Sequence, residues 1–224
     1  MPLGKLYIVA TPIGNLGDIS LRALETLKAA DFVLSEDTRV GGKLLTYFQI
    51  KKPFISYHHH SDQTKVKEII AHLENGKNLA LITDAGTPGI SDPGNILISD
   101  IIKNNPQTEI IPIPGASAVI AALSVSGFPT DKFLFLGFPP HKNKRQKFFK
   151  EVAAAEHTAV FYESPHRIKK CLGELTEVLE KNREVVVCRE LTKKFESIYR
   201  GTMEEILKMN IPEKGEFVIV IRNK

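Results

Sequence analysis

The fold of this chain is decided by the stretch "NLALITDAGTPGISDPG" at residues 78–94. The apolar run at 79–82 predicts a strand in a sheet that is covered on both faces. The eleven residues at 84–94 hold three glycines, two prolines and two aspartates, whereas a simple connection needs only about two to six residues. Gly86 and Gly89 leave backbone N–H and C=O groups open to a ligand, and the prolines hold the loop in one shape. We therefore predict a ligand-binding loop at the carboxyl end of a buried strand.

Strand-like runs alternate with helical patterns on both sides of this stretch. In the first half, apolar runs predict further strands at 5–10, 31–36 and 108–114. Helices are predicted between the strands at 21–27, 38–48 and 66–73. Another helix is expected after the loop, with Asp92 as its N-cap and Pro93 at its first position. This βαβα order predicts a mostly parallel sheet flanked by helices.

The second half of the chain has a different arrangement of strands. Five apolar runs predict strands there, at 132–138, 158–163, 184–190, 196–202 and 216–221. Few helical residues separate the last three, which predicts a mixed, partly antiparallel sheet. We therefore expect two α/β lobes, an N-terminal one at 1–112 and a C-terminal one at 113–224. Ligands of such proteins bind near the carboxyl ends of strands, so we place the site in the cleft between the lobes.

Composition and charge limit the function classes. Hydrophobic residues make up 42% and charged residues 25% of the chain, as in a globular protein. The sequence has no run of about 18 apolar residues and no export signal, so we expect a cytoplasmic protein without a membrane span. Residues 1–112 hold 11 Lys+Arg and 12 Asp+Glu, and residues 113–224 hold 19 and 14, so the net charge of +4 arises in the second half. The basic segment "HKNKRQKFFK" at 141–150 is either a solvated helix face or a site for a polyanionic partner.

Several other loops could carry chemistry. The glycines at 10–20 form neither G-x-G-x-x-G nor a Walker loop, which favours a tight turn over a phosphate site. "PGAS" at 114–117 offers the free N–H groups of a helix N-terminus. Four polar clusters at strand ends are suited either to phosphates or to structural ion pairs: "SEDTR" (35–39), "YHHHSD" (57–62), "FYESPHR" (161–167) and "CRELTKK" (188–194). The histidines at 58–60 lack the spacing of metal ligands, so no metal site is expected.

Seven motifs together point to one family: "TPIGNLGDIS", "SEDTR", "DAGTPGISDPG", "PIPGASA", "FYESPHR", "CRELTK" and "GEFVIVI". In their order and spacing the chain resembles the ribosomal RNA small subunit methyltransferase I family of the tetrapyrrole methylase superfamily, over nearly its whole length. The resemblance implies a two-lobed α/β enzyme, usually a homodimer, that binds S-adenosylmethionine between its lobes. It also implies methylation of the ribose 2′-hydroxyl of a cytidine in the decoding region of 16S ribosomal RNA, either free or in the assembled small subunit.

The resemblance assigns residues motif by motif. The implied cofactor contacts are Pro12, Ile13, Asp84, Ala85, Gly86, Thr87, Ile90, Ser117, Ala118, Tyr162 and Leu191. Polar side chains at strand ends near this site could contact RNA or take the proton of the ribose hydroxyl. They form the expected catalytic set, Glu36, Arg39, His166, Arg167 and Glu190.

Two other functions stay open on the sequence alone. A related enzyme could methylate a ring carbon of a tetrapyrrole precursor, although the basic second half and the motifs at 35–39 and 161–167 favour RNA. A noncatalytic RNA-binding or ribosome-assembly module could keep the same cleft. Family members often continue into a helical extension after the last strand, whereas this sequence stops at Lys224, which bears on how much RNA-binding surface it carries.

Overall fold

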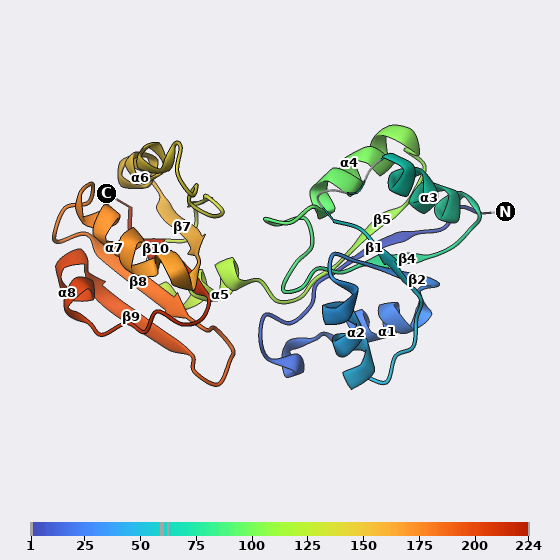
Figure 1. The fold of residues 1–224 in the computed structure, drawn as a ribbon, viewed down its shortest axis with the longest axis horizontal. Helices are drawn as coiled ribbons and strands as arrows, with labels where there is room; N and C mark the ends of the chain where they lie inside the picture. The colour runs from blue at the N-terminus through green and yellow to red at the C-terminus, as the bar shows by residue number, and fades with distance from the viewer. Residues whose placement is uncertain (1, 59–60, 62, 224) are drawn as a thin grey trace. The chain divides into compact units, whose positions relative to one another are not determined.

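The computed structural model describes residues 2–58, 61 and 63–223. Contacts divide the chain into two compact units, Met1–Ser117 and Ala118–Lys224 (Figure 1). None of the helices among the described residues combines the length and the apolar composition needed to cross a membrane.

The first unit is built on a parallel sheet. Its strands are β1 (Leu6–Val9), β2 (Phe32–Ser35), β3 (Phe54–Ser56), β4 (Leu79–Leu81) and β5 (Ile110–Ile113). They lie in the order β3-β2-β4-β1-β5, and every pair is parallel. Since β5 pairs with β1 as far as Ile113, the division between the units falls after Ser117 rather than after residue 112.

Helices cover both faces of this sheet. They are α1 (Leu21–Ala29), α2 (Thr38–Tyr47), α3 (Gln63–Glu74) and α4 (Gly94–Asn104), and a short 3-10 helix, η1 (Leu16–Asp18), precedes α1. Figure 1 shows α1 and α2 on one face and α3 and α4 on the other. Side chains of a strand alternate between its two faces: Leu6 and Ile8 join the core beneath α3 and α4, whereas Val9 joins the core beneath α1 and α2. A strand buried on both sides therefore needs the continuously apolar sequence seen at β4.

The start of α4 differs by one residue from the expectation. Pro93 is the N-cap and Gly94 the first helical residue, rather than Asp92 and Pro93. The Asp92 carboxylate accepts hydrogen bonds from both Gly89 N and Gly94 N, each at 2.8 Å. Oδ1 of Asp92 therefore closes the loop and also accepts from the first free N–H of the helix. Because it serves both groups, Asp92 lies one residue before the N-cap position.

The second unit is built on the mixed sheet that the sequence predicts. Its strands are β6 (Phe133–Phe135), β7 (Thr158–Glu163), β8 (Glu184–Arg189), β9 (Ser197–Thr202) and β10 (Phe217–Ile221). They lie in the order β6-β7-β10-β8-β9. The β6–β7 pair is parallel, and the other three pairs are antiparallel.

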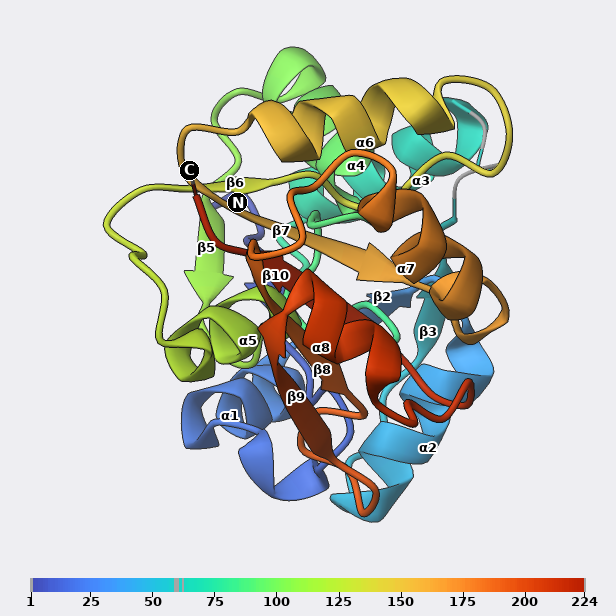
Figure 2. The same cartoon turned by 90° about the vertical axis from the view of Figure 1, so that its left-hand side faces the viewer.

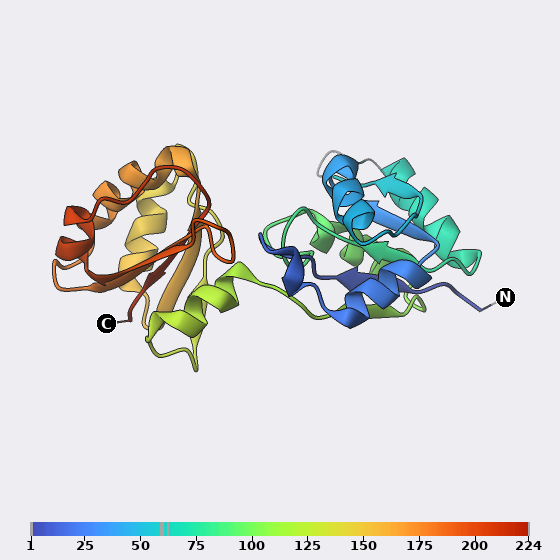
Figure 3. The same cartoon turned by 90° about the horizontal axis from the view of Figure 1, so that it is seen from below.

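Two helical layers cover this second sheet. The helices are α5 (Ala118–Ser126), α6 (Arg145–Ala154), α7 (Ile168–Thr176) and α8 (Met203–Lys208), and a 3-10 helix, η2 (Pro165–Arg167), precedes α7. Figure 2 shows α6, α7 and α8; their apolar side chains share one core with Phe161 and Ile219 of the sheet. Helix α5, seen in Figure 3, packs on β10 and β7. It lies on the opposite face, because Tyr162, which alternates with Phe161 along β7, has its hydroxyl near the backbone of Val119 at the start of α5.

Candidate active site

Three loops meet at the carboxyl edge of the first sheet. They follow β1, β4 and β5, which are neighbours in the sheet order, so their loops leave the sheet side by side. Thr11 and Gly86 form a two-bond bridge between the first two loops, with N···O distances of 2.9 and 3.1 Å. The Thr87 hydroxyl donates to Ala116 O at 3.1 Å and ties the third loop to them. The structure therefore joins all three segments into one backbone-rich wall.

The middle loop is held in a conformation that suits glycine. Gly86 and Gly89 have φ of 85° and 87°, and Ser91 has φ of 64°. These values lie in the left-handed region, which residues other than glycine seldom adopt. A Cβ on Gly86 would lie 3.4 Å from Ile13 Cγ2 and 3.6 Å from Ala116 O. Ile13 and Ala116 therefore pack against Gly86, and the wall has few bulky side chains.

The structure brings most of the implied cofactor residues of the first unit into this wall. Pro12, Ile13 and Gly86 are buried, Asp84 and Ala85 are exposed, and Ile90 is 49% exposed. Ser117 is the last residue of the first unit, and Ala118 begins α5. Open backbone beside small and apolar side chains fits a flat, polar group such as an adenine or an amino-acid moiety. These open backbone groups and small side chains therefore fit S-adenosylmethionine, which carries both an adenine and an amino-acid moiety.

A charged cluster lies next to the wall, where β2 and β4 end. Arg39 donates to Asp37 through Nε and Nη2, at 3.0 and 2.7 Å. These hydrogen bonds, with the Arg39 backbone N–H, lower the pKa of Asp37 to about 2. Asp84 is exposed as a residue, but partial burial of its carboxyl, together with the negative charge of Asp37, raises its pKa, although the backbone N–H of Asp37 and the charge of Arg39 oppose the rise. Asp84 therefore belongs to this cluster as much as to the loop.

The raised pKa of Asp84 predicts a gain of stability on neutralisation. The folded state binds this proton more tightly than the unfolded state, whose carboxyl has the ordinary pKa of 3.8. Stability therefore falls as pH rises from 3.8 through the folded pKa. We expect Asp84→Asn to unfold at higher urea concentration than the wild type at pH 7, and the difference to shrink below pH 3.8. A variant that is less stable than the wild type at pH 7 would contradict the assigned surroundings of Asp84.

The expected catalytic residues of the first unit differ in their partners. The Arg39 side chain is 86% exposed and is held by Asp37 alone among the described residues. Glu36 is half-buried, directly after β2, and its carboxylate makes no hydrogen bond or ion pair with another described residue. Glu36 is therefore available to a substrate without breaking a contact.

In the second unit, the buried carboxylate of Glu163 joins Arg167 to a network of ion pairs. Glu163 Oε1 lies 2.8 Å from Arg167 Nη2, and Oε2 lies 3.1 Å from Arg145 Nη2. Arg145 also binds Glu174, at 2.8 Å. Arg167 further donates to the carbonyl of Pro139 at 2.9 Å. The Arg167 guanidinium is thus occupied by structural contacts.

This network separates one residue from the basic segment at 141–150, for which the sequence predicts either a solvated helix face or a site for a polyanionic partner. Arg145 is only 4% exposed and belongs to the core side of α6. Burial of its charge is compensated by two carboxylates, Glu163 and Glu174. Only the lysines of the segment form its basic surface.

The carboxylate of Glu190 is also held by contacts within the second unit. Its Oε1 accepts from Glu216 N at 2.9 Å and from Lys193 Nζ at 3.0 Å. Partial burial acts to raise its pKa, but these two contacts outweigh it, and the pKa of Glu190 lies below its ordinary value. The residue has φ of 53°, so its carboxylate stabilises a strained turn.

The remaining assigned residues of the second unit have separate surroundings. Tyr162 is half-buried between Phe135 and Phe138, with ring centroids at 5.1 and 5.2 Å. Leu191 is buried, at 8% exposure, and His166 is exposed on η2. The sequence left the clusters at 35–39 and 161–167 open between phosphate binding and structural ion pairs. The structure shows an ion pair between Arg39 and Asp37 and another between Arg167 and Glu163.

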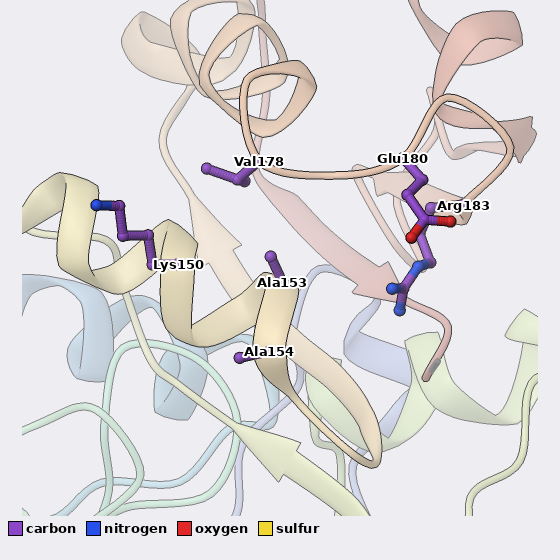
Figure 4. Close-up of a pocket in the computed structure, with 6 residues that line it drawn as sticks. All are labelled: Lys150, Ala153, Ala154, Val178, Glu180 and Arg183. Carbon is purple, nitrogen blue, oxygen red and sulfur yellow. The ribbon is translucent and has the colours of Figure 1, made fainter.

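A hollow of about 290 Å³ lies elsewhere in the second unit. Figure 4 shows it between α6 and the turn before β8, lined by Lys150, Ala153, Ala154, Val178, Glu180 and Arg183. Glu190 and Leu191 follow the other end of β8, so the hollow contains none of the assigned residues. No cluster of three or more metal-ligating side chains occurs among the residues described here; His59 and His60 lie outside them.

Known proteins resemble this chain in sequence and fold. The family model "Tetrapyrrole (Corrin/Porphyrin) Methylases" matches residues 5–207. A ribosomal RNA small subunit methyltransferase I of Synechocystis sp. is 49% identical over 98% of this chain and 79% of that protein. The protein of the same name from Halalkalibacterium halodurans is 46% identical over 97% of this chain and 75% of its own length.

A solved structure shows the same fold. Uroporphyrin-III C-methyl transferase from Thermus thermophilus, complexed with S-adenosylhomocysteine, superimposes with a TM-score of 0.66 at 15% identity, over 98% of this chain and 97% of that one. This likeness and the family match confirm the expected two-sheet α/β architecture. Relatives with more than 40% identity over nearly the whole sequence establish the narrower kinship. The chain therefore belongs to the ribosomal RNA small subunit methyltransferase I family, within the tetrapyrrole methylases.

Proposed function

We propose that this enzyme methylates the ribose 2′-hydroxyl of a cytidine in the decoding region of 16S ribosomal RNA, with S-adenosylmethionine as donor. The names of its relatives support the substrate class. The observation that carries the proposal is the wall made by the loops after β1, β4 and β5, joined through Thr11, Gly86 and Thr87. By the same resemblance, the enzyme acts as a homodimer in the cytoplasm, on free RNA or the assembled small subunit.

The wall is suited to hold the donor in one orientation. Related methyltransferases support this use, since one was solved with S-adenosylhomocysteine. When bound, S-adenosylmethionine supplies an electrophilic methyl group, whose transfer depends on alignment with the acceptor oxygen. Ile13 and Gly86 fix the shape of the wall, and Thr87 fixes the distance between two of its loops. In the second unit, Tyr162 and Leu191 are proposed to complete the contacts.

A ribose hydroxyl becomes a better nucleophile when a base removes its proton. Of the five assigned polar residues, Arg39, Arg167 and Glu190 hold structural partners. Glu36 and His166 are the side chains that can take a proton without losing a contact among the described residues, and we assign that role to this pair. The three engaged residues are proposed to shape the surface that receives the RNA.

Transfer of label tests the proposal. Purified protein, labelled S-adenosylmethionine and undermethylated small subunits should give labelled 16S RNA. A Glu36→Gln, His166→Gln double variant should bind the cofactor normally and transfer about a hundredfold more slowly, since general-base catalysis typically contributes 10²–10⁴-fold. Label that enters a porphyrinoid and never RNA would favour the tetrapyrrole alternative. Absence of cofactor binding would favour a noncatalytic RNA-binding module.

A further inference from the structure

The segment "GFPP", residues 137–140, joins β6 to α6 and carries an exposed aromatic ring. Phe138 is 51% exposed, although its neighbour Pro139 is buried. An exposed aromatic ring offers a flat apolar face to a binding partner. None of the roles assigned above uses it.

The backbone of this segment is fixed by hydrogen bonds from the interior. Tyr162 N donates to Gly137 O at 2.8 Å. Arg167 Nη1 donates to Pro139 O at 2.9 Å, and Arg145 Nη1 donates to Pro140 O at 3.2 Å. Both guanidinium groups are themselves anchored on Glu163. The ring is therefore presented by a rigid support, which lowers the entropy cost of binding.

The surroundings of the ring combine aromatic and positive groups. The Tyr162 ring lies 5.2 Å from that of Phe138 at an interplanar angle of 52° and supports it from one side. The chain then continues into three exposed lysines, Lys142, Lys144 and Lys147. Within the described ranges no carboxylate pairs with any of the three, so their charges are free to meet an anion.

We propose that Phe138 stacks on an unpaired nucleobase of the substrate RNA, while the lysines of 142–147 bind the adjoining phosphates. The proposal rests on the function proposed above and names how the same site recognises its RNA. Proteins bind single-stranded RNA by stacking bases on aromatic rings and by placing cations along the backbone. The buried network of Arg145, Glu163 and Arg167 is the support that positions this ring.

Two substitutions at Phe138 test the stacking contact. Phe138→Leu keeps an apolar side chain but removes the flat ring, and we expect the KM for undermethylated small subunits to rise roughly ten- to hundredfold, the effect of losing one base–aromatic stack. Affinity for S-adenosylmethionine should stay within twofold. Tyr47→Leu, which changes a 64% exposed ring on α2, should leave both quantities unchanged. An unchanged KM for Phe138→Leu, or a loss confined to cofactor affinity or to oligomeric state, would overturn the proposal.

A fluorescence measurement separates this inference from the proposed function. The chain has no tryptophan, so Phe138→Trp introduces a single reporter that can still stack. A single-stranded oligoribonucleotide containing the decoding-region cytidine should quench its emission, and quenching should weaken with salt. The Tyr47→Trp control should not be quenched. Quenching without label transfer by the wild type would refute the proposed function alone; label transfer without quenching would refute the stacking contact alone.

Discussion

Replacing Glu163 with alanine is expected to lower the free energy of unfolding of the second unit by about 3–5 kcal/mol, the usual cost of removing one partner from a buried ion pair. The Glu163 side chain is fully buried, and those of Arg145 and Arg167 are 5% and 15% exposed. Loss of the carboxylate would leave two guanidinium groups without their shared anion. It would also remove the acceptor of the Ser164 N–H, now at 2.7 Å. Chemical denaturation, followed by circular dichroism, measures the loss.

A surface pair provides the matched control. Glu204 pairs with Lys208 at 3.0 Å on α8, with both side chains more than half exposed. Such pairs contribute about 0.3–0.5 kcal/mol, so Glu204→Ala should change stability little. Glu163→Gln keeps the shape but not the charge and should fall between the two. A loss of less than about 1 kcal/mol in Glu163→Ala would mean that the network is not a structural anchor.

Gly86→Val is expected to weaken S-adenosylmethionine binding by about ten- to hundredfold, because small displacements within a positioned site cost this much. Gly86 has φ of 85°, where a β-branched residue is strained. Its Cβ would touch Ile13 Cγ2 at 3.4 Å, and the added methyl groups would push Ile13 or open the bridge to Thr11. Either movement changes the wall that holds the cofactor. Isothermal titration calorimetry measures the affinity.

A second glycine of the same unit shows whether the effect is local. A Cβ on Gly42, inside α2, would meet nothing within 4 Å. Gly42→Ala should raise stability by up to about 1 kcal/mol, since alanine favours helix, and leave cofactor affinity unchanged. If Gly86→Val bound S-adenosylmethionine as tightly as the wild type, the loop after β4 could not be the cofactor wall.

The sequence predicts the architecture well because its signals are local. The continuously apolar run at 79–82 predicts a sheet covered on both faces, and the structure places β4 at the centre of that sheet. Few helical residues separate the last three strands, and this likewise predicts the antiparallel pairs that the second sheet contains. The helix start at Gly94 was missed by one residue, because Asp92 serves two N–H groups at once.

Side-chain partners are less predictable, since they depend on contacts between distant residues. Arg145 looks like one cation among five in "HKNKRQKFFK", yet it reaches Glu163 and Glu174, 18 and 29 residues away. Periodicity within α6 assigns it to the buried side only once Phe148, Phe149 and Val152 are known to face the core. For Arg167 and Glu190 the sequence left substrate contacts and structural ion pairs both open, because it does not show which distant groups their side chains reach.

Mass spectrometry of the modified nucleoside tests the central claim most directly. Undermethylated small subunits are incubated with the protein and S-adenosylmethionine, and their 16S RNA is then digested to nucleosides. We predict one new product, a cytidine that carries the methyl group on its ribose 2′-oxygen, absent when protein or cofactor is omitted. A methyl group found on a base, on another nucleoside, or on no RNA at all would contradict the account.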